Sequence, residues 1–461
     1  MPFPLRIKSF ELASLLKIFG NLVFLVFIIY TIVYAIERTT YIDSAWIFFR
    51  QLNTEGFAAA PERWAAFIPE LFLFAGIKIG LPFKALVYLF SVSYILWYSI
   101  IWRLCVYKLN NPIAGVVILL GLFMGIRESF LHTVTEIHQV IVYGAMLFAV
   151  LQYGSFTNIS VKRLVIFLVV TLILFTHPTG SFIAAFVLIY FLIHDGNFKN
   201  PFILTTLIIV TLFALWTYFH PANPYDAEQI GLLSKNSSFD FTGSHAFDFI
   251  IMHSKRFYWL PELALVFVLM RFALSRQWIK LGFTLLSVLF YLLIVIVTFR
   301  KGDSSIMLER AFLPAFFMIN LALADILVSA KINKWIPIGL VIFFFVCGIK
   351  FINDGCLRYK KRVAYLDTLI QSGIKSGNDK FYLANDAVDP DKILVPWAFG
   401  TETLIYSKFK YDKCISITVD NPDCPPATFE AVSDFCIAVK DLNPAYFSLS
   451  QSGYQELSVT K

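Results

Sequence analysis

Three side chains that can bind a metal stand at intervals of four in one polar segment, residues 127–138. They are Glu128, His132 and Glu136. Residues four apart share a helical face, so we expect a helix on which these groups converge on one point. Two carboxylates and an imidazole can hold a divalent cation, and Mg²⁺ or Mn²⁺ is the expected cofactor. The same spacing also arises at a solvated helix end, where Glu136 would serve only as a cap.

A further candidate is Asp43, which lies soon after the first apolar run ends. A carboxylate at a membrane surface is costly to desolvate and therefore usually has a partner or a function. Asp43 is a candidate general base that takes a proton from a hydroxyl acceptor. The alternative is that it caps a helix over residues 44–52, and the two roles can coexist. Glu62 and Arg63 follow in the same loop.

Basic residues in one late loop are candidates for binding a phosphate group. They are Arg300, Lys301 and Arg310. Guanidinium groups bind phosphate through paired hydrogen bonds, which explains basic residues on the side of the membrane where they are otherwise depleted. Pairing with the neighbouring Asp303 and Glu309 is the alternative. His177 lies in a short turn on the same side and is expected to be interfacial.

The composition requires most of the chain to lie in lipid. Of the 461 residues, 58% are hydrophobic and 15% charged, and the net charge is +7. The mean hydropathy is +0.71. Such a chain has too little polar surface for a water-soluble globule. Its Lys and Arg residues are scattered between apolar runs instead of forming a stripe, so the sequence argues against nucleic-acid binding.

Apolar runs long enough to cross about 30 Å of hydrocarbon predict about eleven transmembrane helices. The runs begin near Ser14, Lys84, Pro112, Ile137, Val161, Thr179, Pro201, Tyr258, Leu281, Ala311 and Trp335. Residues 61–81 form a further apolar stretch, which we interpret as a non-spanning juxtamembrane element. With this choice the Lys and Arg residues of the inner loops all fall on the side of the N-terminus, as the positive-inside rule requires. The candidate residues then all lie on the other side.

We therefore expect an all-α membrane domain over residues 1–353 and a small α/β domain over residues 354–461. We expect a protein of the bacterial inner membrane with a cytoplasmic N-terminus and an extracytoplasmic C-terminal domain. Short β-prone runs lie at 381–384, 393–395, 414–419 and 436–439. Cys356, Cys414, Cys424 and Cys436 allow two disulfides in an oxidising compartment, with three possible pairings.

The order of these features resembles the GT-C superfamily, the membrane glycosyltransferases that use lipid-linked sugars, such as protein O-mannosyltransferases and the aminoarabinose transferase of lipid A. The resemblance covers about residues 14–327. It depends on Asp43 after the first span, the juxtamembrane stretch, Glu136 at the fourth span, and Arg310 before Phe312-Leu313-Pro314. It implies that Asp43 is the catalytic acidic residue, that Glu136 helps to bind a metal or the donor, and that Arg310 contacts phosphate.

The sequence thus predicts a membrane enzyme that transfers a sugar from a polyprenyl-phosphate donor to an extracytoplasmic glycan, lipid or protein. Two other classes remain open. One is a transporter or lipid flippase, which predicts charges along an inner path and related halves. The other is a non-catalytic assembly protein whose C-terminal domain binds a partner through Trp397 and Phe399.

Overall fold

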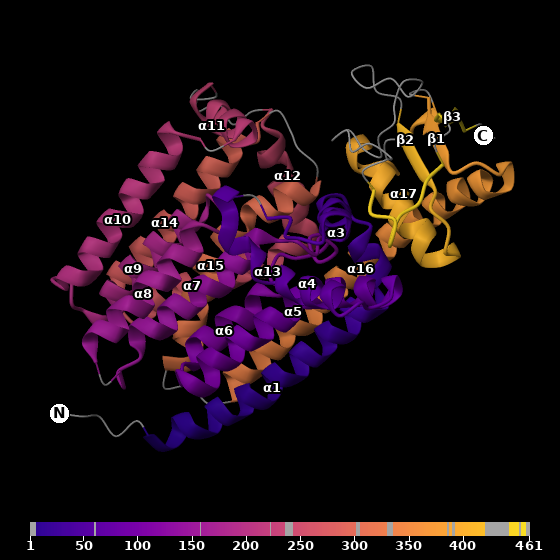
Figure 1. The fold of residues 1–461 in the computed structure, drawn as a ribbon. Coiled ribbons are helices and arrows are strands. Elements are labelled where there is room, and N and C mark those ends of the chain that lie inside the picture. The colour runs from indigo at the N-terminus through magenta and orange to yellow at the C-terminus, as the bar shows by residue number, and fades with distance from the viewer. Residues whose placement is uncertain are drawn as a thin grey trace.

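Helices make up most of the chain (Figure 1). The computed structural model describes residues 6–59, 61–156, 158–221, 223–235, 243–300, 305–329, 335–384, 387–389, 392–419, 442–450 and 453–457. The main helices of the bundle are α1 (Arg6–Val33), α5 (Phe83–Arg103), α6 (Pro112–Gly121), α7 (Glu136–Gln152), α8 (Ile159–Leu174), α9 (Gly180–Asp195), α10 (Pro201–Phe219), α13 (Trp259–Leu274), α14 (Trp278–Thr298), α15 (Ser305–Ser329) and α16 (Trp335–Ser376).

Seven helical runs in the described part of the chain are long and apolar enough to cross a membrane. They are Ser14–Val33, Phe83–Lys108, Pro201–Phe219, His245–Leu274, Trp278–Thr298, Ile306–Ser329 and Trp335–Ser376. The apolar helices α6, α7 and α9 are shorter, and α8 has 16 residues. The chain is therefore a helical membrane protein, and the crossing of all eleven runs stays a prediction.

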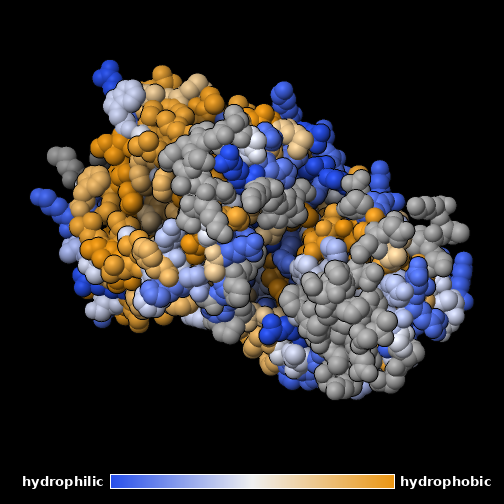
Figure 2. All heavy atoms as spheres, turned by 90° about the horizontal axis from the view of Figure 1, so that it is seen from above, coloured by the Kyte–Doolittle hydropathy of each residue, from blue (hydrophilic) through white to orange (hydrophobic). Residues whose placement is uncertain are grey.

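The outer surface of the bundle carries many hydrophobic side chains, whereas the surface of a soluble protein is largely polar. Ile18, Leu22, Leu25 and Ile29 form an exposed stripe along α1. Similar exposed apolar side chains cover α8, α10 and α14. Figure 2 shows hydrophobic residues gathered over one end of the molecule. In contrast, α15 is almost wholly buried and packs against α6, α13 and α14. Outward apolar stripes around a buried central helix are what a lipid solvent requires.

Short elements gather at the end of the bundle that lies away from the N-terminus (Figure 1). They are α2 (Ala35–Thr39), α3 (Asp43–Thr54), η1 (Pro61–Phe67), α4 (Glu70–Lys78), α11 (Pro224–Lys235) and α12 (His245–His253). The π-helical turns η2 (Leu104–Lys108) and η3 (Ser254–Tyr258) extend α5 and α12. Since η1 and α4 are too short to cross a membrane, the stretch 61–81 agrees with the predicted non-spanning element.

One continuous helix joins the bundle to a small α/β unit near the C-terminus, which we call the C-terminal domain. With 42 residues, α16 is roughly 60 Å long, about twice the thickness of the hydrocarbon. It passes through the predicted domain boundary at residues 353 and 354 without a break. Its second half packs against α17 (Pro396–Tyr411), which covers a parallel sheet of order β2-β1-β3. The strands are β1 (Lys380–Leu383), β2 (Ser416–Val419) and β3 (Gln455–Glu456).

The predictions for this domain have mixed outcomes. Strands β1 and β2 overlap the predicted runs 381–384 and 414–419. The run 393–395 is not a strand, because a turn closed by bonds from Lys392 N and Ile393 N to Asp389 O leads directly into α17. The run 436–439 lies outside the described residues. Cys356 is buried within α16, and it and Cys414 have free thiols. The predicted disulfides are therefore not seen in the described part of the chain, and Cys424 and Cys436 lie outside it.

Candidate functional site

A cavity of about 770 Å³ lies between the short elements, α15 and the C-terminal domain. Its volume is in the range of small-molecule binding sites. The predicted residues that line it are Asp43, Glu62, Arg63, His132, Glu136, His177 and Arg310. We call this the main cavity. Predicted site residues that are far apart in the sequence therefore line the same cavity.

Asp43 is the centre of a compact polar group in the main cavity. Its Oδ2 lies 2.9 Å from Nε2 of His132 and 3.6 Å from Nη1 of Arg310. The same Nη1 lies 3.3 Å from Nε2 of His132. The side chains of His132 and Arg310 are nearly buried, whereas 39% of the Asp43 side chain is exposed to the cavity. A carboxylate is thus presented to a ligand with a guanidinium group beside it.

The partners of Asp43 keep it ionised. Burial raises the pKa of this carboxyl, but the hydrogen bond from His132 and the charge of Arg310 outweigh burial and lower the pKa to about 2. Burial and the charge of Arg310 lower the pKa of His132. At neutral pH the imidazole is therefore uncharged, and we assign its proton to Nε2, which donates to Asp43.

The backbone before Asp43 fixes its position. Helix α3 begins at Asp43, and the N-cap position is occupied by Ile42, with no hydrogen bond from a capping side chain. The alternative interpretation of Asp43 as an N-cap is therefore wrong. The N–H of Ser44 donates to Tyr41 O over 2.8 Å, and Ile42 has φ 40° and ψ −114°. These angles resemble the first central position of a type II′ turn, where glycine is favoured.

The predicted metal ligands do not share a helical face, because residues 127–135 are turns and coil and α7 begins only at Glu136. The carboxylate of Glu309 accepts hydrogen bonds from N–H groups of Arg127, Glu128 and Ser129, which holds the segment in this form. Glu128 then pairs with Arg358, and Glu136 with Arg63. No three His, Cys, Asp or Glu side chains of the described residues gather as a metal site.

Arg63 links two acidic residues at the wall of the main cavity. Its Nη1 lies 2.8 Å from Glu136, and its Nη2 lies 2.7 Å from Asp226 of α11. Asn223 donates to Glu62 and Asp226 and extends the network. The sequence did not predict Asp226 as a site residue, because no motif or residue spacing indicates that α11 contacts η1.

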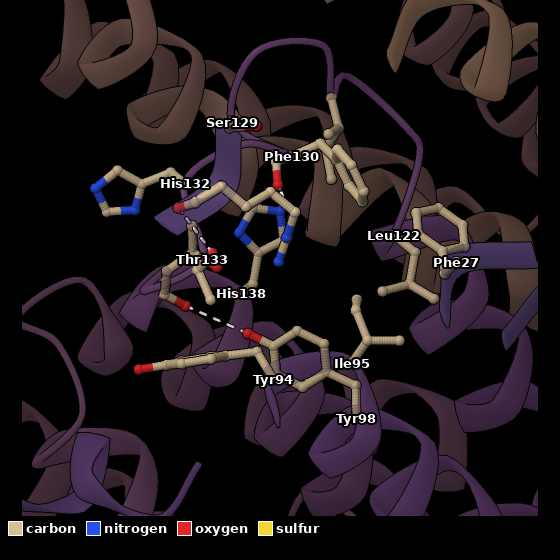
Figure 3. Close-up of a pocket in the computed structure, with 13 residues that line it drawn as sticks. Phe27, Tyr94, Ile95, Tyr98, Leu122, Ser129, Phe130, His132, Thr133 and His138 are labelled. Carbon is tan, nitrogen blue, oxygen red and sulfur yellow. Dashed lines mark hydrogen bonds between the residues drawn. The ribbon is translucent and has the colours of Figure 1, made fainter. Parts of the chain in front are cut away.

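His132 also lines a smaller hollow of about 30 Å³, together with residues of the bundle (Figure 3). Its residues include Arg38, Tyr98, His138 and Thr133. The buried guanidinium of Arg38 donates to Ser91 and to the carbonyl oxygen of Phe130, and Thr133 Oγ1 donates to the carbonyl oxygen of Arg38. Arg38 was not predicted as a site residue; it anchors the segment that carries His132.

Arg300, a second predicted phosphate ligand, does not line the main cavity. It follows α14, and its carbonyl oxygen accepts a bond from His245 N. Lys301 and Asp303 lie outside the described residues. Glu309, the other proposed partner of these basic groups, binds the backbone N–H groups of residues 127–129 instead. Of the predicted phosphate ligands within the described residues, Arg310 is therefore the one that lines the main cavity.

A second hollow of about 270 Å³ adjoins the main cavity, and Glu62, Arg63 and His177 line both. Its other walls are mostly apolar and include Phe182 of α9, Phe213 of α10 and Ile294 of α14. We call it the apolar hollow.

No protein-family model, curated protein or solved structure matches the chain. The description of the site therefore rests on its geometry. An ionised carboxylate and a guanidinium group line the main cavity, and the apolar hollow lies beside it.

Glu70 is a buried acid of the main cavity that sequence reasoning did not place there. Its Oε2 accepts a hydrogen bond of 2.8 Å from the N–H of Ala58. Burial raises the pKa of this carboxyl from 4.5 to about 7, although backbone hydrogen bonds from Ala58 and Ala59 oppose the rise. The folded protein therefore binds this proton more tightly than the unfolded chain does.

This pKa predicts the pH dependence of stability. The contribution of Glu70 is fully present below pH 4.5 and falls as the pH rises through 7, by about 3 kcal/mol in total. Glu70→Gln keeps an acceptor for Ala58 without the charge. We expect this variant to melt at a higher temperature than the wild type at pH 8 and at a similar temperature at pH 5, in thermal unfolding of the detergent-solubilised protein. Glu55→Gln, at an exposed position, is the control, and equal melting of Glu70→Gln and wild type at pH 8 would refute the assignment.

Proposed function

We propose that the protein is an integral-membrane glycosyltransferase that moves a sugar from a polyprenyl-phosphate donor to a hydroxyl acceptor. The observation that carries the proposal is the placement of Asp43 beside Arg310 in a cavity that continues into the apolar hollow. A polyprenyl-phosphate sugar has the matching parts, which are an anionic phosphate, a polar sugar and a long apolar chain. In this proposal the phosphate binds Arg310 and the first isoprene units occupy the apolar hollow.

In the proposed reaction, Arg310 stabilises the leaving phosphate and Asp43 takes the proton of the acceptor hydroxyl. The acceptor hydroxyl attacks the anomeric carbon, and the bond from this carbon to the phosphate oxygen breaks. Polyprenyl phosphate leaves with the electron pair of that bond, and Arg310 stabilises its negative charge. The hydroxyl proton passes to Asp43, and since Oδ2 faces His132 and Arg310, Oδ1 is the oxygen that takes it.

Donor binding would also adjust the base. With a pKa of about 2, free Asp43 has a low affinity for protons. A phosphate on Arg310 compensates the positive charge that lowers this pKa, so Asp43 becomes more basic when the donor is bound. Asp43 is therefore a stronger base in the donor complex, where the reaction takes place, than in the free protein. Arg310, and not a cation held by Glu128, His132 and Glu136, neutralises the leaving group in this scheme.

The proposal includes the predicted topology. Eleven crossings, a cytoplasmic N-terminus and an extracytoplasmic C-terminal domain would place the main cavity on the outer side of a bacterial inner membrane. There the acceptor is a glycan, a lipid or a protein of the cell envelope. The positive-inside distribution of Lys and Arg supports this orientation.

The direct test is cleavage of a defined donor. Purified protein in liposomes is incubated with a panel of polyprenyl-phosphate hexoses, pentoses and aminopentoses and with a cell-envelope extract as the source of acceptor. We expect release of free polyprenyl phosphate from at least one donor, detected by mass spectrometry. A transporter would instead move the intact donor across the bilayer, so flipping without cleavage would overturn the proposal.

A further inference from the structure

A buried carboxylate of the C-terminal domain contacts the backbone that carries Asp43. Glu402, in α17, has no exposed surface, and its Oε1 accepts a hydrogen bond of 3.0 Å from the N–H of Ile42. Its Oε2 pairs with Nη2 of Arg362, in the second half of α16. Glu402 therefore joins α16 and α17 to the residue immediately before Asp43, although it lies 360 residues away in the sequence.

Ile42 has a backbone conformation that its side chain disfavours. Its φ of 40° lies in the left-handed region, which β-branched residues rarely adopt. Such a conformation persists only where the surrounding structure holds it. The N–H of Ile42 points at Glu402, so this carboxylate is one of the groups that hold the turn. Relaxation of Ile42 would rotate the start of α3 and move the Asp43 carboxylate.

Neighbouring contacts from α16 act on the same turn. Tyr359 donates from Oη to the carbonyl oxygen of Thr40 over 2.7 Å, and Arg362 donates to Tyr359 Oη over 2.5 Å. The rings of Tyr41 and Tyr359 pack with centroids 4.7 Å apart. Residues on both sides of Ile42 are thus held by the half of α16 that lies beyond the bundle.

The C-terminal domain also forms one wall of the main cavity. Leu394, Val395 and Trp397 line it together with residues of the short elements of the bundle. The domain therefore reaches the proposed site in two ways, through the backbone of Asp43 and through the cavity surface. An appended module that only bound a separate partner would need neither contact.

We propose that Glu402 is a positioning residue for Asp43, so that the C-terminal domain is an integral part of the active site. This inference rests on the proposed function. Its structural content is that the bond from Ile42 N to Glu402 holds the turn at residues 41–44 in the form that aims Asp43 at the cavity. A displacement of about 1 Å in such a group can lower turnover by about 10²-fold.

Two substitutions of Glu402 separate positioning from general stability. Glu402→Gln keeps an acceptor for Ile42 N but loses the charge that pairs with Arg362. Glu402→Ala loses both. Lys410→Gln is a matched control, because Lys410 pairs with Asp367 and also joins α17 to α16, at an exposed site away from Ile42.

Turnover of the donor identified by the cleavage assay is measured at a temperature where all variants are folded. We expect Glu402→Ala to lower kcat by about 10²-fold with KM changed less than about threefold. We expect Glu402→Gln to recover most of kcat even if it melts earlier, and Lys410→Gln to match the wild type. Equal loss of kcat in the Gln and Ala variants, or none in either, would overturn the proposal.

Hydrogen exchange tests the inference without substrate. Exchange of the amides in a peptide that spans residues 40–46 is followed by mass spectrometry in the detergent-solubilised full chain. We expect exchange at least about tenfold faster in Glu402→Ala and near the wild-type rate in Glu402→Gln and Lys410→Gln. If the wild type cleaves no donor, the proposed function fails, while this measurement still decides whether Glu402 holds the turn. Unchanged exchange in Glu402→Ala would refute it.

Discussion

Asp43→Asn is expected to lower turnover of the polyprenyl-phosphate donor by about 10²–10⁴-fold, because it removes the group that takes the acceptor proton. The amide is nearly the same size as the carboxylate, and its oxygen can still accept the hydrogen bond from His132 Nε2. The fold and donor binding should therefore remain. The measurement is kcat for release of polyprenyl phosphate, together with the melting temperature and the affinity for farnesyl phosphate.

The control for this variant is Asp412→Asn, which changes an exposed carboxylate at the end of α17 that pairs with Lys408. We expect wild-type turnover there, since Asp412 contacts neither the main cavity nor the turn at residues 41–44. Wild-type turnover in Asp43→Asn would show that Asp43 is not the base. Loss of folding in Asp43→Asn would show that its charge is structural, which also contradicts the assignment.

Arg310→Gln is expected to lower kcat by about 10²–10³-fold and to weaken binding of farnesyl phosphate, because the guanidinium stabilises the phosphate that leaves. It should also change the pH profile. Arg310 lowers the pKa of Asp43, so its removal raises this pKa, and the acid limb of the pH–rate profile moves to higher pH. Arg310→Lys keeps the charge but not the fork of donors, so we expect partial recovery.

The matched control is Arg358→Gln, because Arg358 pairs with Glu128 near the same end of the bundle and is not part of the cavity lining. Its turnover and pH profile should equal those of the wild type. A shift of the acid limb to lower pH in Arg310→Gln would contradict the electrostatic role given to Arg310. Equal effects of the two Arg substitutions would indicate a general loss of positive charge instead of a specific contact.

Features that depend on local composition were predictable from the sequence. Apolar runs predicted the helices, and the distribution of Lys and Arg suggested that Asp43, Glu136 and Arg310 lie on one side. The structure places these three residues on one cavity. Hydrophobicity and charge are properties that each segment carries by itself, so no knowledge of distant contacts was needed.

Features that depend on distant contacts were not predictable. The interval of four between Glu128 and His132 suggested a helix, but Glu309 binds the backbone N–H groups there and stabilises a turn. The isoleucine at position 42 gave no sign of its positive φ, because β-branched residues rarely adopt one. The signal for Glu402 itself was present, as a single acidic residue within a run of small and apolar residues that begins at Pro396.

The structure of the full chain in lipid nanodiscs with bound polyprenyl phosphate, determined by electron cryomicroscopy, would show directly whether the main cavity and the apolar hollow bind the donor lipid. We expect a phosphate about 3 Å from the guanidinium of Arg310, on the cavity side of Asp43, with its isoprenoid chain in the apolar hollow between α9, α10 and α14. A phosphate bound away from Arg310, or a lipid chain that avoids the apolar hollow, would contradict this expectation.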